Sequence, residues 1–283
     1  PLTIGKTLTI GKRTFAGTQL TELTIYNHIP ESAFEGIKSL KILRVDFSSN
    51  TYNTIDKNAF KDCAISSIME FYSVEIKTDA FFNAQFTNGT SGATLFFKDT
   101  TISSYAFRYF QISKCLINLT DASIKDNAFE TMTGQPTVNF HHVVNTDEDS
   151  SPSPPTNVIG AYAFYNTEIQ GNLDIPSFIK TIKQYAFAYC SGLTGYLNIN
   201  ATQIYNYAFY SSGFIGSLNL GSEVGLISAY ENDEGNVVDA EESFTFRRCN
   251  FNALTLNNEG SITSRAFYKM TSIVSSLTIP ETV

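Results

Sequence analysis

Long apolar runs and charged residues are scarce in this chain of 283 residues, and each scarcity excludes a class of protein. No apolar run approaches the ~18 residues that a membrane helix needs, so we expect no insertion into a membrane. Acidic residues (27) outnumber basic residues (19), for a formal charge of -8, whereas nucleic acid binding needs a basic surface. Charged residues make up only 16% of the chain. We therefore expect a largely neutral, polar surface and no nucleic acid partner.

A repeat organises the chain instead. A phenylalanine preceded by a small residue recurs eleven times, and the small residue is alanine in nine cases. Successive copies are 19 to 26 residues apart, except for two steps of 35. An isoleucine stands five residues before the phenylalanine in ten of the eleven copies. The phenylalanines are Phe15, Phe34, Phe60, Phe81, Phe107, Phe129, Phe164, Phe187, Phe209, Phe244 and Phe267.

A short apolar-polar-apolar triplet follows most of these phenylalanines, as in Leu197-Asn198-Ile199 and Leu218-Asn219-Leu220. Such alternation is typical of a strand with one buried face. One strand and one return segment cannot bury an apolar core alone, so consecutive units must stack into a solenoid. We expect about twelve short parallel strands on the concave face, with short helical or irregular return turns, and classify the fold as α/β.

The repeat resembles the BspA-type leucine-rich repeats. The pattern L-x-I, a spacer and I-x-x-x-A-F-x-x-C is clearest at Leu173-Asp174-Ile175-Pro176 followed by Ile182, Ala186, Phe187 and Cys190. Only Cys63 and Cys190 keep the consensus cysteine in this alignment of the repeats. The resemblance implies a surface-exposed or secreted protein of a bacterium or a parasitic protist, with a role in adhesion. It implies no particular partner.

We expect one leucine-rich-repeat solenoid over residues 1–283, cut within a repeat at both ends, with insertions at 145–157 and 221–242. Both insertions are placed between a triplet and the next isoleucine, which would put them on one edge. They carry ten of the 27 acidic residues and no basic residue. This acidic rim could bind a basic partner or Ca²⁺, or could simply keep long loops soluble. Its main residues are Asp147, Glu148, Asp149, Glu231, Asp233 and Glu234.

The middle residues of the triplets should form a polar row on the outer face of the sheet. In a parallel stack these side chains stand one above another, as a hydrogen-bonded ladder, a platform for a ligand, or a solvated surface without a ligand. The candidate binding residues are Arg44, Asn118, Asn139, Asp174, Asn198, Asn219 and Thr255. Tyr165, Tyr210 and Tyr268 follow the repeated phenylalanine and offer a second candidate. They would form either an exposed stripe suited to glycans or a cover for gaps between turns.

Cysteine and histidine are too few, and too unfavourably spaced, to predict a chemical site. Four cysteines fall in four different repeats, with the closest repeats two strands apart, beyond disulfide reach, and they match no zinc motif. We expect buried thiols. The adjacent His141 and His142 should point to opposite faces, and no histidine accompanies a nucleophile as in a hydrolytic triad. We therefore predict no catalytic residue, no metal and no cofactor.

These observations favour a non-enzymatic recognition or adhesion module that binds an extracellular protein or a glycan and acts as a monomer. Two alternatives remain open. The repeats could be a structural spacer that projects another domain, or a noncatalytic region of a larger surface enzyme.

Overall fold

Parallel strands and tight turns build the whole described part of the chain. The computed structural model describes residues 1–48, 53–87, 94–143, 157–231, 237–239, 244–257, 261–262, 265–270 and 276–278. It divides the chain into two compact units, which we call the N-terminal unit (Pro1–Thr156) and the C-terminal unit (Asn157–Val283). The described residues contain no helix, and so none that could cross a membrane.

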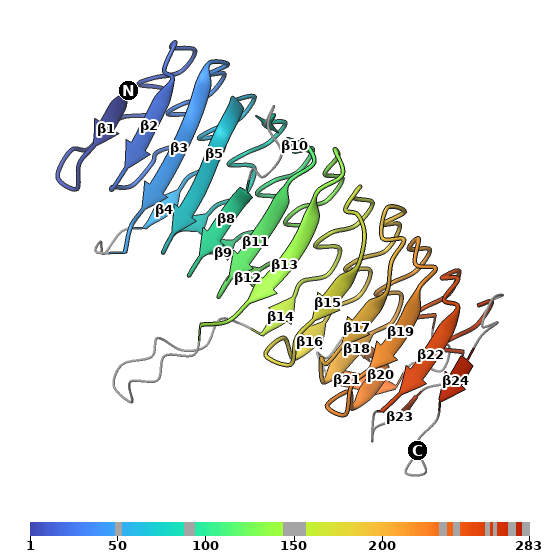
Figure 1. Ribbon diagram of the computed structural model, residues 1–283. Helices are drawn as coiled ribbons and strands as arrows, with labels where there is room; N and C mark the ends of the chain where they lie inside the picture. Colours follow the sequence, from blue (N-terminus) through green and yellow to red (C-terminus); the bar gives the residue numbers. More distant parts are fainter. Residues whose placement is uncertain are drawn as a thin grey trace. The chain divides into compact units, whose positions relative to one another are not determined.

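The N-terminal unit has a sheet of seven long parallel strands in chain order (Figure 1). A ladder of two-residue parallel strands runs beside it. Two further short strands, β7 (Gln85–Phe86) and β10 (Gln111–Ile112), belong to the sheet of long strands, because β7 pairs with Ala64 and Ile65 and β10 pairs with β7. The long strands are β1 (Leu2–Ile4), β2 (Glu22–Ile25), β3 (Leu40–Asp46), β5 (Ala64–Tyr72), β8 (Thr94–Lys98), β11 (Leu116–Thr120) and β13 (Thr137–His141). The short strands are β4 (Thr54–Ile55), β6 (Glu75–Ile76), β9 (Thr101–Ile102) and β12 (Ser123–Ile124).

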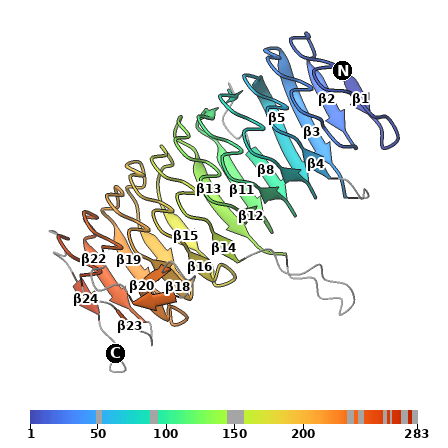
Figure 2. The ribbon, with the colours of Figure 1, turned by 180° about the vertical axis from the view of Figure 1, so that it is seen from behind.

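The C-terminal unit repeats this plan with five long strands, which lie side by side in both ribbon views (Figures 1 and 2). An antiparallel partner, β21 (Val237–Asp239), pairs with β20 of its second ladder. The long strands are β15 (Leu173–Ile175), β17 (Leu197–Ile199), β19 (Ser217–Leu220), β22 (Ala253–Leu256) and β24 (Ser276–Thr278). The second ladder contains β14 (Val158–Ile159), β16 (Thr181–Ile182), β18 (Gln203–Tyr205), β20 (Leu226–Glu231) and β23 (Ser261–Ile262).

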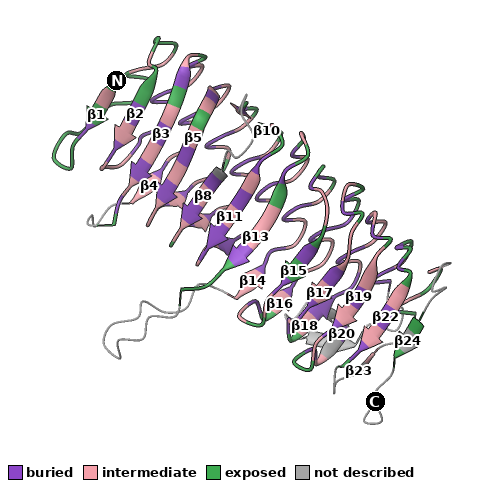
Figure 3. Cartoon of the chain, viewed as in Figure 1, coloured by how far each residue is buried: buried purple, intermediate pink, exposed green. Residues whose placement is uncertain are grey.

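The triplets lie in the long strands with the predicted alternation. In β17, Leu197 and Ile199 are buried while Asn198 between them is partly exposed, and Figure 3 shows the same alternation along β3 and β5. Leu197 is paired with Leu218, and Ile199 with Leu220. Like residues therefore stack on like residues. The prediction of about twelve parallel strands is confirmed by the seven and five long strands of the two units.

A column of stacked phenylalanine rings fills the interior behind the long strands. In the N-terminal unit, successive rings from Phe15 to Phe129 are 4.8 to 5.4 Å apart and nearly parallel. In most repeats the amide N–H of the phenylalanine donates to the carbonyl of the alanine in the next coil, as Phe60 does to Ala80 at 2.8 Å. That alanine is fully buried, so only a small side chain fits where the two coils approach.

The expected α/β class and helical return turns are wrong, because the returns are consecutive tight turns. Residues two before and two after the column phenylalanine have a positive φ, as do Asn58 (58°) and Asp62 (57°) around Phe60. A helix needs an unbroken run of right-handed residues, and the left-handed residues in the returns prevent one; the return around Phe246 has one such residue, Arg248, and the others have two. The isoleucines before the returns form the short parallel strands of the second ladder, such as Ile55 opposite Ile76.

The phenylalanine column passes through Phe246, and the assignment of Phe244 to it is wrong. Phe246 stacks between Phe209 (5.6 Å) and Phe267 (5.4 Å). Phe209 donates its amide hydrogen to Thr245, which takes the place that alanine has in other repeats. Phe244 lies two residues earlier along the turn, where the neighbouring repeat has Tyr207, 5.4 Å away between ring centroids.

The second insertion also lies elsewhere in its repeat than predicted. Ile227 pairs with Ile204 and Ile262, so it is the isoleucine of this repeat. The extra residues follow Ile227, and they include an antiparallel pair formed by β20 and β21. The first insertion lies between β13 and β14, before its isoleucine. The two insertions therefore leave the repeat at different points, which removes the argument from equal placement for one shared edge.

All four cysteines are buried and free, as predicted. Burial raises the pKa of each thiol to about 12. Cys63, Cys190 and Cys249 each donate from Sγ to the carbonyl of the column phenylalanine in the preceding coil, at 2.9, 3.0 and 3.1 Å. With Phe246 in the column, Cys249 is a third consensus cysteine, three residues after its phenylalanine.

Candidate binding site

The polar row predicted from the triplets forms in the C-terminal unit. Asp174, Asn198, Asn219 and Thr255 are register partners on the adjacent strands β15, β17, β19 and β22. Each lies between two buried apolar residues, so its side chain is on the outer face of the sheet. Thr278 of β24 continues the row.

Hydrogen bonds connect the first three residues of this row into a ladder. Asn219 Nδ2 donates to Asn198 Oδ1, and Asn198 Nδ2 donates to Asp174 Oδ1, both at 2.6 Å. The Tyr196 hydroxyl donates to the other oxygen of Asp174 at 3.0 Å, and this bond and the carboxylate charge raise the pKa of Tyr196. Asp174 therefore fixes the orientation of the Tyr196 and Asn198 side chains. We call Asp174, Tyr196, Asn198 and Asn219 the polar ladder.

The polar ladder fixes the orientation of its amides. Each Asn donates one N–H along the row, which leaves the second N–H of Asn198 and a carbonyl lone pair on each Asn for other partners. Asn219 Nδ2 also lies 3.4 Å from Ser217 Oγ. Parallel strands are ~4.8 Å apart, so these donors and acceptors repeat at that spacing on the open side of the sheet. Such an array suits a ligand with regularly spaced hydroxyl or amide groups.

The N-terminal unit brings Arg44, Asn118 and Asn139 into one register row, with Glu70 and Phe96 between Arg44 and Asn118. These side chains do not form a ladder. Arg44 Nε pairs with Glu70 at 2.9 Å. The two asparagines bond within their own strands, Asn118 to Thr120 (3.2 Å) and Asn139 to His141 (2.9 Å). The ring of Phe96 interrupts the row. The candidate residues thus form two rows, and only the C-terminal one is joined by hydrogen bonds among the described residues.

The acidic rim residues can be placed only in part. Asp147, Glu148, Asp149, Asp233 and Glu234 lie outside the described residues. Glu231 ends β20, and its side chain is likewise outside the description. A common acidic rim therefore remains a prediction, without the shared edge that was its main support.

The predicted tyrosine stripe belongs to a larger aromatic strip on the return turns of the C-terminal unit. Tyr162, Tyr185 and Tyr207 stack at 4.9 and 4.8 Å, and the predicted Tyr165 and Tyr210 meet them edge-on. The predicted Tyr268 is 42% exposed and contacts Phe244 at 5.7 Å. The rings mostly cover one another, as in the predicted cover between turns. Tyr162, Tyr185, Tyr189 and Tyr207 were missed, although three of them stand two residues before a repeated phenylalanine.

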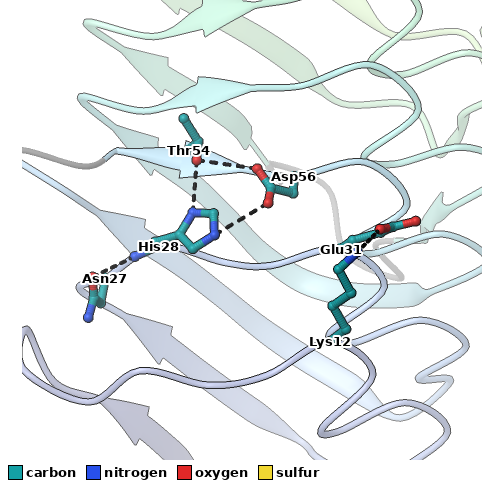
Figure 4. Close-up of polar contacts among 6 residues, drawn as sticks. All are labelled: Lys12, Asn27, His28, Glu31, Thr54 and Asp56. Carbon is teal, nitrogen blue, oxygen red and sulfur yellow. Dashed lines mark hydrogen bonds and ion pairs between the residues drawn. The ribbon is translucent and has the colours of Figure 1, made fainter.

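Two histidines of the N-terminal unit, His28 and His142, join neighbouring coils. Figure 4 shows His28 between Thr54 (2.8 Å) and Asp56 (3.3 Å) of the next coil. The Thr54 hydroxyl also lies 3.4 Å from Asp56, so the three side chains satisfy one another. His141 and His142 have different partners, Asn139 and Asp121, as expected for adjacent residues facing opposite ways. No group of three or more metal-ligating side chains occurs within the described residues.

Comparison with known proteins identifies the repeat. A model of the BspA type leucine rich repeat region matches the chain in six copies, over residues 8–134, 100–232 and 240–283. No curated protein and no solved structure matched the chain. The matched stretches cover nearly the entire chain, and the stacked coils, phenylalanine column and consensus cysteines described above supply their physical basis. The chain therefore belongs to the BspA-type leucine-rich repeat family.

Proposed function

We propose that this protein is a non-enzymatic recognition module, displayed on a cell surface or secreted, that binds a glycan or an extracellular protein on the C-terminal long-strand sheet. Proteins of this repeat family are typically surface-associated, which supports the location. The observation that carries the proposal is the polar ladder. Its side chains are fixed before any ligand arrives, so binding loses little side-chain entropy.

A glycan fits the chemistry of the ladder better than a protein does. Sugars present many hydroxyl groups at regular spacing, and neutral amides can donate to and accept from such groups. The row beyond the ladder continues with Thr255 and Thr278, which add further hydroxyls. A protein partner would more often use a large apolar centre, and the outward side chains of the central strands here are polar.

Binding to glycan and matrix-protein arrays tests the proposal. The full chain is compared with Asn198→Lys and Asn219→Lys, each of which places an unpaired charge in the ladder. Signal on the bound ligand should fall about tenfold or more in both variants. Asn139→Lys, the same change in the N-terminal row, is the matched control and should leave the signal unchanged.

Other results would point to the alternatives. An array without any bound ligand supports a spacer that projects another domain, and equal loss in all three variants places binding elsewhere. A monomer is part of the proposal, and light scattering on the purified chain checks it. The second alternative, a noncatalytic region of a larger surface enzyme, requires a catalytic domain elsewhere in the same protein. The whole reading frame would reveal such a domain.

A further inference from the structure

A shallow hollow of about 200 Å³ lies on the return turns of the N-terminal unit, and no long-strand residue lines it. Three successive coils contribute to it, the ones around Phe60, Phe81 and Phe107. Its lining residues are Lys57, Asn58, Lys61, Asp79, Phe82 and Arg108.

Positive charge exceeds negative charge in the hollow, in a chain whose formal charge is -8. Three cations face one carboxylate, that of Asp79, which pairs with Arg108 Nη2 at 3.2 Å. Lys61 Nζ is 3.8 Å from Glu35, at the limit of an ion pair. Among the described residues no carboxylate lies within 4.0 Å of Lys57 Nζ, and the carboxylate that its charge acts on, Glu31, is already paired with Lys12 Nζ at 2.6 Å. At least one cation is thus left without a close counter-ion.

Aromatic rings hold Arg108 in place. Its guanidinium carbon lies 5.2 Å from the ring centre of Phe82, 5.1 Å from Tyr105 and 5.6 Å from Tyr109. Cation–π contacts and the Asp79 pair fix a planar group that recognises oxyanions well. Phe82 also lines the hollow, so an apolar ring stands beside the cations.

We propose that this hollow binds the oxyanion of an acidic sugar, a carboxylate or a sulfate, with the sugar ring packed against Phe82. Its volume is below the ~300–1,000 Å³ of a pocket for a whole small molecule, so one charged group enters and the remainder of the glycan stays outside. Lys57 and Lys61 attract the oxyanion with their positive charge, and the fixed, planar guanidinium of Arg108 orients it. The site is formed by return turns of the N-terminal unit, whereas the polar ladder lies on long strands of the C-terminal unit, so the site stands or falls independently of the proposed function.

Calorimetric titration of the full chain tests the site with three oligosaccharides of equal length, one of uronic acids, one sulfated and one neutral. Lys57→Glu and Lys61→Gln are the test variants. Lys57 is exposed, so its replacement should not disturb folding, which a thermal melt verifies. Lys41→Glu, at an exposed position on β3, makes the same charge change away from the hollow.

At least one of the two acidic oligosaccharides should bind, and the neutral one should not. Whichever acidic oligosaccharide binds more tightly shows whether the hollow prefers a carboxylate or a sulfate. Lys57→Glu should weaken binding about tenfold and Lys61→Gln about fivefold, with Lys41→Glu and Asn198→Lys unchanged. Inorganic sulfate should compete. Equal binding of the neutral oligosaccharide, equal weakening by Lys41→Glu, or no binding of either acidic oligosaccharide would overturn the proposal.

Discussion

At the scale of single residues, a thiol or hydroxyl three positions after the column phenylalanine ties one coil to the coil before it in four of the repeats, at Cys63, Cys190, Ser212 and Cys249. Cys63 donates to Phe34, and Ser212 donates to Phe187 at 2.6 Å from the corresponding position. A serine hydroxyl thus makes the same bond as a cysteine thiol.

Cys63→Ser should therefore be tolerated, whereas Cys63→Ala should be destabilising. Serine keeps a donor for the Phe34 carbonyl, as Ser212 shows for Phe187, and should change the free energy of unfolding by less than about 1 kcal/mol. Alanine leaves that buried carbonyl without this partner and should cost about 1–2 kcal/mol. Urea denaturation measures both. Equal stability of the two variants would show that the hydrogen bond contributes nothing.

The buried thiols also predict how stability depends on alkaline pH. An unfolded thiol ionises near pH 9, whereas burial raises the pKa of these four to about 12. The contribution of the protonated thiols to the free energy of unfolding is complete below pH 9. It is lost as the pH rises from 9 toward 12, by up to ~1.4 kcal/mol per pH unit for each thiol. Urea denaturation at pH 8, 9 and 10 should show this decline. Replacing all four cysteines with serine should flatten the curve, and an unchanged slope would contradict the assignment.

At the scale of the elements, the phenylalanine column carries much of the packing between coils. Phe246 has a stacked ring on either side and is fully buried, whereas Phe244 is 8% exposed and its ring contacts are tilted. Phe246→Ala should lower the free energy of unfolding by about 3–5 kcal/mol. Phe244→Ala should lower it by less, because that ring covers the turn and does not fill the core. The reverse order in denaturant titrations would restore Phe244 to the column.

How much of each element could be predicted depended on how regularly it repeats. The phenylalanines of the column and the residues of the polar row recur at fixed offsets, so both features could be predicted from the sequence alone. Phe246 was missed because Phe244 and Phe246 stand two residues apart, neither follows an alanine, and an inserted hairpin separates them from Ile227. The two-residue strands are too short to show alternation.

Return turns were the least predictable elements. Left-handed positions usually favour glycine or asparagine, yet Tyr185 (φ 56°) and Tyr189 (φ 61°) occupy two of them. A tyrosine in the sequence therefore gives no indication that its backbone is left-handed. The direction of hydrogen bonding in the polar ladder was equally hidden, since it depends on Asp174 accepting from both Asn198 and Tyr196.

At the scale of the molecule, each unit buries its apolar residues in continuous columns, not in one central core. Every coil then depends on its neighbours, and the surfaces inherit the same register as the interior. The polar ladder exists only because Asn198 and Asn219 are register partners. A shift of one residue along the strand would place buried leucines where these asparagines are.

Oxidative cross-linking of engineered cysteines measures that register directly. In Asn198→Cys/Asn219→Cys the two Cα atoms are ~4.8 Å apart, within disulfide range, whereas in Asn198→Cys/Ser217→Cys they are about 8 Å apart and out of range. The native thiols are buried and should stay reduced. Peptide mapping by mass spectrometry under non-reducing conditions should find the 198–219 link and no 198–217 link. The opposite pattern, or neither link, would contradict the parallel in-register stack on which the polar ladder and its proposed function depend.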